Sequence, residues 1–274
     1  MAGWTLDDIP WADFDPSRVD PAIVPLVKAA SMVESNAADY RTYLDNVFGD
    51  DDRVKRAVEG WAAEEQQHGA ALARWAALAD PGFDYAASFR AFTAGYRIPV
   101  EAAASVRGSR AGEMVARCMV ETGTNSFYSA LAEATSEPVL KAICRRIADD
   151  ELAHYWLFHR HMRRYLERDR LGFFARLRIA LGRIAESEDD ELAYAYYAAN
   201  AHGAGEAYDR RRHGGEYQRR ALAYYTPSVV RSAVGMVFSA VGLESHGLAG
   251  RAVTRLACWL VKRRRSALAR LAAA

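Results

Sequence analysis

Two short motifs in the sequence combine side chains that bind transition metals. Both have the form Glu-x-x-His, with Glu65 before His68 and Glu151 before His154. On a helix, residues three positions apart project from the same face, so each pair can bind one metal ion. Of the seven histidines, only these two follow a glutamate at this spacing. The sequence therefore predicts two helices that each present a metal-binding pair.

A further glutamate precedes each motif by about the length of one helix and a turn. Glu34 lies 31 residues before Glu65, and Glu121 lies 30 residues before Glu151. One Glu from each of two helices, with Glu-x-x-His from each of two others, is the inward-facing ligand set of dinuclear carboxylate bundles. Four carboxylates balance two divalent ions, whereas without metal they would repel one another and be costly to bury. We predict a centre for two iron ions, with manganese as the alternative, bound by Glu34, Glu65, His68, Glu121, Glu151 and His154.

Neighbouring residues leave alternatives for this ligand set. Glu64 lies four residues before His68 and could replace Glu65, although the spacing of the second motif favours Glu65. His161 lies seven residues after His154, where a structural or surface role is expected. Carboxylate and imidazole ligands favour iron or manganese over zinc or copper. The three cysteines are far apart, which argues against a structural zinc site or an iron–sulfur cluster bound by this chain alone.

The elements that must position these residues are helices. Alanine is abundant and apolar residues recur at three- and four-residue spacing, so the pattern predicts an all-α fold: a four-helix bundle with additional C-terminal helices. We expect an N-terminal arm at residues 1–20, the bundle at residues 21–168, and further helices of the same domain at residues 169–274. Helices are predicted at 21–47, 52–78, 85–97, 101–134 and 138–168. In the rest of the chain, breaks between helices are predicted near 182–187, 213–215 and 226–227.

At the metal motifs the chain resembles the soluble acyl-carrier-protein desaturases, a branch of the ferritin-like superfamily. Residues 61–69 read W-A-A-E-E-Q-Q-H-G and residues 147–154 read I-A-D-D-E-L-A-H, and both segments are similar to signatures of that branch. Leu26-Val27 with Glu34 and Tyr40, and the segment 121–124, resemble its two other ligand helices. The resemblance covers about residues 20–168 and implies a ferritin-like bundle.

The resemblance also implies roles for residues beside the metals. Thr124 lies one turn after Glu121 and would face the side where oxygen binds. Asp150 would bond His68, the histidine of the other motif, and so fix the orientation of its ring. In this family a tryptophan of the N-terminal segment belongs to the proposed electron path, and Trp4 or Trp11 could take that place here.

The implied function is an oxygen-dependent di-iron oxidoreductase that introduces a double bond into a fatty-acyl chain. Acyl-carrier protein or another acyl carrier would present the substrate, and an external donor such as ferredoxin would supply electrons. Alternatives remain open: a di-iron hydroxylase or N-oxygenase, a ferritin-like protein that oxidises iron or scavenges peroxide, or a metal-free helical interaction protein. A deep apolar channel beside the metals would favour lipid oxidation over iron storage.

Charge is unevenly distributed along the chain. Residues 1–60 carry six Lys or Arg against 12 Asp or Glu, whereas residues 205–274 carry 13 against four. The basic end could meet an acidic carrier or an anionic membrane surface, with Arg263, Arg264 and Arg265 in contact, and no nucleic-acid partner is expected. The apolar residues of 229–241 would pack on the bundle or cover an opening for the acyl chain. Because no signal peptide or spanning segment is expected, we predict a cytoplasmic protein. We also predict that the chain forms a homodimer.

Overall fold

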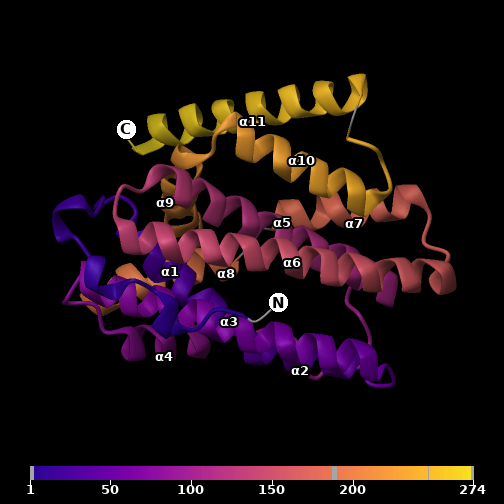
Figure 1. The fold of residues 1–274 in the computed structure, drawn as a ribbon, viewed down its shortest axis with the longest axis horizontal. Coiled ribbons are helices and arrows are strands. Elements are labelled where there is room, and N and C mark those ends of the chain that lie inside the picture. The colour runs from indigo at the N-terminus through magenta and orange to yellow at the C-terminus, as the bar shows by residue number, and fades with distance from the viewer. Residues whose placement is uncertain (1–2, 187–189, 246, 273–274) are drawn as a thin grey trace.

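The computed structural model describes residues 3–186, 190–245 and 247–272. These residues form α-helices and short 3-10 turns without a β-strand, which confirms the all-α class (Figure 1). The first half of the chain contributes α1 (Val24–Ser35), α2 (Ala37–Val47), α3 (Asp52–Ala79), α4 (Tyr85–Gly95), α5 (Arg110–Ala134) and α6 (Pro138–Asp169). The second half contributes α7 (Phe173–Glu186), α8 (Asp190–Asn200), α9 (Arg210–Ala221), α10 (Pro227–Val241) and α11 (Leu248–Ala272).

The four helices that carry the metal motifs pack as two pairs, α1 against α3 and α5 against α6. Side-chain caps fix where three of them begin. Asp51 accepts the N–H groups of the first turn of α3, Ser109 does so for α5, and the buried Glu137 does so for α6, where Pro138 occupies the first helical position. Capping sets the register of each long helix, and the register decides which side chains turn inward.

Two apolar clusters occupy opposite ends of this bundle. On α3, residues 54–62 belong to one cluster and residues 71–76 to the other, while His68 lies between them. The same division holds on α5 and α6, where Glu121 and Glu151 fall between the two clusters. The polar residues of the two motifs are therefore held at one level of the bundle by apolar packing on both sides.

Two predicted helices are shorter than the sequence indicated. The expected helix 21–47 is divided at Asn36, whose backbone (φ −84°, ψ 9°) leaves the helical region between α1 and α2. The expected helix 101–134 begins only at Arg110, because Gly108 adopts φ +81° and ends any helical path from residue 101. Neither change moves Glu34 or Glu121 out of its helix.

Of the breaks predicted between the later helices, the one at 226–227 is confirmed and the one at 213–215 is wrong. Thr226 caps α10 and Pro227 is its first residue, as expected. The break predicted at 213–215 is wrong, because these residues lie inside α9; the chain turns instead near Gly205, which has φ +75°. Gly182 lies inside α7, and Ser187, the end of that predicted break, lies outside the described residues.

The later helices pack on the bundle. Helix α8 packs against α1, α7 and α10 pack against α5, and α11 packs against α10 at the edge of the molecule (Figure 1). The predicted apolar residues of 229–241 are mostly buried. Among the described helices, none has the length and hydropathy to cross a membrane. The division of the chain at residues 20 and 168 stays a prediction.

Candidate metal centre

The structure brings all six predicted ligands to one place in the bundle. Each side chain turns inward, and each residue is no more than 7% exposed. They come from all four ligand helices: Glu34 on α1, Glu65 and His68 on α3, Glu121 on α5, and Glu151 and His154 on α6. The duplicated spacing thus corresponds to one shared site, and the role of these residues as ligands stays a prediction.

The six residues form two neighbouring groups that can each hold a metal ion. One group is Glu34, Glu65, His68 and Glu151, and the other is Glu65, Glu121, Glu151 and His154; within each, one potential ligand atom per residue lies within 4.8 Å of the others. Glu65 and Glu151 belong to both groups. Two ions bound here would therefore share two carboxylates, while each would have one carboxylate and one imidazole of its own.

Unpaired polar atoms show that this donor set fits metal ions. Nδ1 of His68 and Nδ1 of His154 are fully buried and have no hydrogen-bond partner among the described residues, and the same holds for one oxygen each of Glu121 and Glu151. Nδ1 of His68 lies 3.4 Å from Glu151 Oε1, and Nδ1 of His154 lies 3.2 Å from Glu65 Oε1. Buried polar atoms without partners are costly, and a cation between them would satisfy them.

The outer nitrogen of each imidazole is bonded to a carboxylate. Nε2 of His68 lies 3.0 Å from Asp150 Oδ2, and Nε2 of His154 lies 2.7 Å from Glu64 Oε2. Because a carboxylate accepts, Nε2 of each ring is assigned as the protonated nitrogen, which leaves the Nδ1 lone pair free to bind a metal. The contact between Asp150 and His68 agrees with the expected pairing, and Glu65, not Glu64, is the inward residue.

The N-terminal arm reaches this site through Trp4. Its Nε1 donates to Asp150 Oδ2 at 2.6 Å, and its indole stacks on the His68 ring with centroids 5.9 Å apart and planes within 8°. Trp11 lies elsewhere, where its Nε1 donates to the carbonyl of Leu6. Of the two tryptophans considered, Trp4 is the one that forms a continuous contact with Asp150 and His68.

Two hydroxyl groups hold ligand carboxylates from inside the bundle. Thr124 Oγ1 donates to Glu151 Oε2 at 2.5 Å, and the buried Tyr128 donates to Glu34 Oε1. Thr124 also lies near the carbonyls of the preceding turn, both at 3.3 Å. The threonine predicted on the oxygen side therefore contacts a shared ligand directly, and its part in oxygen chemistry stays a prediction.

Burial and mutual contact shift the pKa values at the centre. Burial raises the pKa of Glu34 and of Glu121 well above the usual range, and a neighbouring carboxylate raises each further. Burial lowers the pKa of His68 and His154, but hydrogen bonds to carboxylates more than offset this and raise both pKa values well above the usual range. Burial raises the pKa of Glu151, but hydrogen bonds with the two histidines outweigh it and lower that pKa. Without metal, Glu34, Glu121, His68 and His154 therefore retain protons that compensate the buried negative charge.

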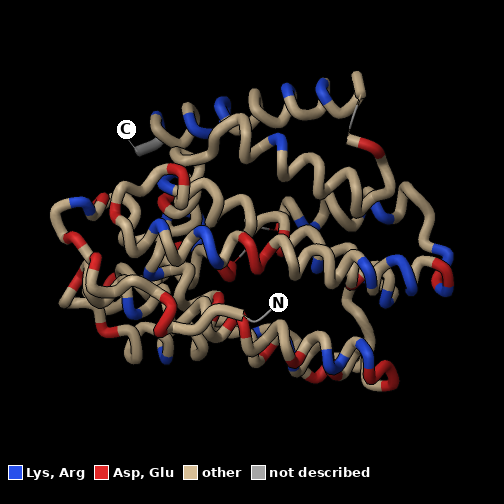
Figure 2. Tube along the Cα trace, viewed as in Figure 1, with Lys and Arg blue, Asp and Glu red and all other residues tan. Residues whose placement is uncertain are grey.

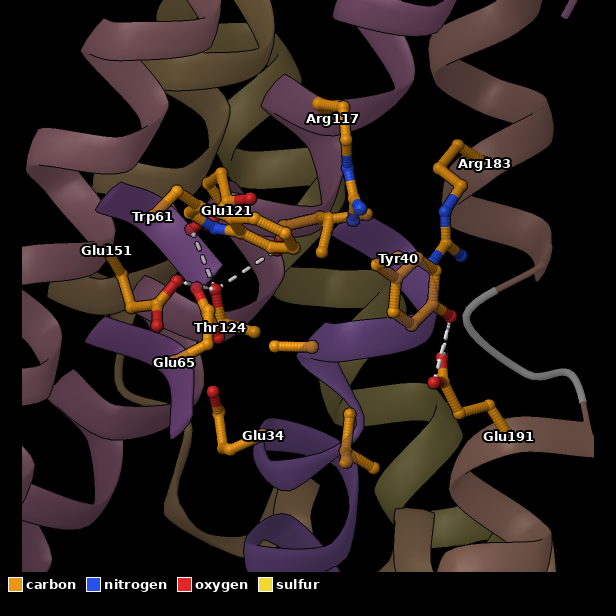
Figure 3. Close-up of a pocket in the computed structure, with 13 residues that line it drawn as sticks. Glu34, Tyr40, Trp61, Glu65, Arg117, Glu121, Thr124, Glu151, Arg183 and Glu191 are labelled. Atoms are coloured by element: carbon orange, nitrogen blue, oxygen red, sulfur yellow. Dashed lines mark hydrogen bonds between the residues drawn. The ribbon is translucent and has the colours of Figure 1, made fainter. Parts of the chain in front are cut away.

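Two cavities adjoin near the ligands, and Figure 3 shows the inner one, which Thr124 lines. The inner one, about 50 Å³, reaches Glu34, Glu65, Glu121 and Glu151. The outer one, about 230 Å³, extends from it toward the loop before α5, and residues of α7 and α8 line both cavities. Neither cavity is lined by α10, so these two do not support the expectation that residues 229–241 cover an opening. Their lining is mixed, with arginines and glutamates among the apolar side chains, and is not the long apolar channel considered from the sequence.

Sequence reasoning missed several residues of this site. Glu64 precedes Glu65 as Asp150 precedes Glu151, so the duplicated motif carried a signal for its role. Tyr128 lies one turn after Thr124 on the same face of α5, and this spacing was a weaker indication that its hydroxyl contacts the ligands. Arg117, Arg183 and Glu191 lie on three helices with no motif in common, so no local pattern indicates that they line one cavity.

Comparison with protein families gives one match. A family model described as fatty acid desaturase matches residues 19–182, which is more than half of the chain and includes all six predicted ligands. No curated protein matches the chain. The acyl-carrier-protein branch stays a prediction, because the match is at the level of the fatty acid desaturase family.

Proposed function

Because this chain belongs to the fatty acid desaturase family, we propose that it is a di-iron, oxygen-dependent oxidoreductase that introduces a double bond into a fatty-acyl chain. The observation that carries this proposal is the pair of adjacent ligand groups that share Glu65 and Glu151. When bound, two ferrous ions would supply the redox chemistry that lets O2 remove two hydrogens from neighbouring methylenes. Manganese remains the alternative metal.

The chain's own residues would hold and orient this centre. Asp150 and Glu64 keep the two imidazoles in one tautomer, and Thr124 restrains the Glu151 carboxylate on the side of the inner cavity. The apolar clusters at both ends of the bundle close the site along the bundle axis. These contacts support an ordered site that the inner cavity reaches beside Thr124.

An external donor such as ferredoxin would supply electrons to this centre. We propose that they enter through Trp4, because its indole bonds to Asp150 and stacks on His68. The side chain of Trp4 is partly buried, so one edge is accessible from outside the bundle. The route is short and consists of groups in direct contact, which supports its use over any path through the apolar clusters.

We propose further that α11 docks on an anionic membrane surface. This helix has seven Lys or Arg residues and no Asp or Glu (Figure 2). Its inner side packs on α10 through Ala257, Cys258 and Val261, yet Leu256, Trp259 and Leu260 are about half exposed. Arginines beside exposed Trp and Leu side chains suit the headgroup region of a bilayer better than the surface of a small acidic protein. A membrane would also be a source of acyl substrate.

The test of the function is a reaction followed by mass spectrometry. Protein loaded with Fe(II) is given O2, a reducing system, and a panel of free fatty acids and acyl thioesters. A product that has lost two hydrogens supports desaturation, whereas a product that has gained one oxygen supports hydroxylation. Thr124→Val should retain iron but change the yield, and Thr124→Ser should restore it. Oxidation of iron without any organic product would contradict the proposal and favour the ferritin-like alternative.

A further inference from the structure

The inner cavity reaches the metal centre from its carboxylate side. All four predicted carboxylate ligands line this cavity, and neither of the two histidine ligands does. Trp4 approaches the centre from the histidine side instead, where it bonds to Asp150 and stacks on the ring of His68. The proposed electron route therefore does not pass through the inner cavity, which leaves the carboxylate side as a separate approach to the centre.

Tyr40 and Glu191 belong to the wall that the inner cavity shares with the outer one. Both residues line both cavities, and both are partly accessible. The Tyr40 hydroxyl donates to the Glu191 carboxylate and lies 2.8 Å from either oxygen. Figure 3 shows this pair across the inner cavity from Glu121, Thr124 and Glu151. The pair is therefore a hydrogen-bonded connection between the two cavities.

The charges around this pair are balanced. Among the described residues, three arginines and three glutamates line the outer cavity: Arg107, Arg117, Arg183, Glu113, Glu186 and Glu191. Glu113 accepts the hydroxyl of Tyr43, and Glu186 accepts two hydrogen bonds of 2.6 Å from Arg107. Of the three glutamates, Glu191 is the one that also lines the inner cavity. It is thus the carboxylate placed to exchange protons with both cavities.

Burial raises the pKa of both members of the pair. The pKa of Glu191 lies above its ordinary value, although the Tyr40 hydroxyl and the charges of Arg183 and Arg117 oppose the effect of burial. The pKa of Tyr40 lies well above its usual range, because the Glu191 carboxylate and the Tyr96 hydroxyl add to the effect of burial. Tyr40 therefore keeps its proton near neutral pH, whereas Glu191 gains and loses one closer to neutral pH than an exposed glutamate does.

The inner cavity has room for water between this pair and the ligands. Its volume is about 50 Å³, and one water needs roughly 15 Å³ of such space, so about three fit. The Thr124 hydroxyl and the ligand carboxylates on its wall are polar partners for that water. Removal of two hydrogens with O2 and two electrons yields two waters and consumes two protons for each double bond. Those protons have to reach a centre that apolar clusters close at both ends of the bundle.

From this arrangement we infer that Glu191 and Tyr40 carry protons from the outer cavity to the carboxylate side of the metal centre. Glu191 takes up a proton from water in the outer cavity and donates it to the Tyr40 oxygen, while Tyr40 passes its own hydroxyl proton to water in the inner cavity. Glu191 returns to a carboxylate, Tyr40 stays neutral, and one proton has moved inward. The separation of 2.8 Å is within the range for such a transfer. The inference rests on the proposed function for the reaction that consumes the protons.

The experiment follows proton uptake when the oxidised iron centre is reduced, since electrons added to a buried centre draw in protons that compensate their charge. Full-length, iron-loaded protein without substrate is reduced by a flash-excited ruthenium complex. An indicator dye follows the protons, and the absorbance of the iron follows the electrons. Glu191→Gln should slow proton uptake at least about tenfold, because a positioned acid–base group contributes about 100-fold or more. Tyr40→Phe should also slow it, although this variant keeps the ring that lies 5.1 Å from Arg117.

Two matched variants control for the loss of a charge and of a hydroxyl. Asp190→Asn changes the exposed carboxylate next to Glu191 in the sequence, and Tyr43→Phe removes a hydroxyl that lines the outer cavity and not the inner one. Both should take up protons as fast as wild type. Iron content and circular dichroism are measured for every variant and should be unchanged.

Chemical rescue separates a proton path from a structural role. Formate fits in the outer cavity of about 230 Å³ and carries a proton as the missing carboxylate would. It should restore fast uptake in Glu191→Gln and leave the rate of wild type unchanged. Slow uptake that formate does not restore would overturn the inference, and so would uptake in Glu191→Gln that is as fast as in wild type.

The proton path and the proposed function fail separately, because the dye experiment contains no acyl chain. Proton uptake that depends on Glu191, together with no desaturated product in mass spectrometry, would support the path and contradict the function. A desaturated product, together with uptake that does not depend on Glu191, would support the function and overturn the path. Wild-type protein that binds no iron would overturn both.

Discussion

Glu64 and Asp150 occupy equivalent positions in the two motifs, one residue before the motif glutamate, and each bonds the histidine of the opposite motif. Asp150 contacts His68 Nε2 at 3.0 Å, and Glu64 contacts His154 Nε2 at 2.7 Å. Each motif therefore supplies metal ligands on its inner face. The carboxylate just before its glutamate bonds the histidine of the other motif. Helices α3 and α6 thus orient each other's imidazoles.

Loss of either outer carboxylate should weaken metal binding without abolishing it. For Asp150→Asn and Glu64→Gln, we expect affinity for Fe(II) to fall about 10- to 100-fold, because the imidazole loses the acceptor that fixes its tautomer. Competition with a chelator measures the affinity. Asp149→Asn, which changes an exposed neighbour, is the control. If all three variants bind iron alike, the outer carboxylates have no part in orienting the histidines.

Loss of a shared carboxylate should remove more metal than loss of an unshared one. Glu65 and Glu151 belong to both ligand groups, whereas Glu34 belongs to one. We expect Glu65→Ala and Glu151→Ala to retain little iron, and Glu34→Ala to retain about one ion per chain. Elemental analysis after gel filtration gives the ratio, with circular dichroism as a check on folding. Glu167→Ala, on the exposed side of α6, should match wild type; unchanged iron in both shared-ligand variants would refute the assignment.

Metal binding should release protons and weaken as the pH falls. In the metal-free protein the pKa values of Glu34, Glu121, His68 and His154 are all raised, so these groups hold protons at a pH where they would ordinarily be free of them. A metal ion must displace those protons, and lower pH favours the protonated, metal-free form. Titration in buffers of different ionisation enthalpy counts the protons released. Affinity that is independent of pH between 5 and 8, about the range over which histidine ordinarily titrates, would contradict this account.

Replacement of Trp4 should affect reduction of the metals and spare their binding. Trp4→Phe keeps an aromatic ring near His68 but removes the N–H that donates to Asp150. We expect unchanged iron content and slower reduction by a protein donor, measured by stopped flow. Trp11→Phe is the matched control, since the indole N–H of Trp11 donates to Leu6 and does not contact Asp150 or His68. Equal reduction rates in the two variants would exclude Trp4 from the electron route.

Vesicles test the docking of α11. Binding to vesicles that contain half phosphatidylglycerol should exceed binding to pure phosphatidylcholine, and salt should weaken it. Changing Arg263, Arg264 and Arg265 together to Ser should reduce the binding at least about tenfold, since each cation near an anionic surface contributes about 1 kcal/mol. Trp259→Ala should reduce it on its own. If light scattering instead shows a dimer that Trp259→Ala dissociates, this face binds a second copy and the membrane proposal fails.

The sequence predicted the centre better than its surroundings for physical reasons. Ligands on regular helices follow the helical period, so Glu34, Glu121 and the two motifs could be assigned from spacing alone. The break at Asn36 carries no Gly or Pro to indicate it. Trp4 meets Asp150 across 146 residues of chain. Arg117 and Arg183 line the same cavity because α7 packs on α5, a contact that no local pattern encodes.

The contact between Ser35 and Gly69 has a consequence for anyone who transplants this centre into a designed bundle. A Cβ at Gly69 would lie 2.2 Å from Ser35 Oγ and 2.8 Å from its backbone nitrogen, so only glycine lets α1 and α3 approach this closely. Each residue directly follows a predicted ligand, Glu34 or His68. The unit to graft is therefore larger than six side chains. It must include Gly69 and the backbone of Ser35, whose close contact sets the distance between the two helices.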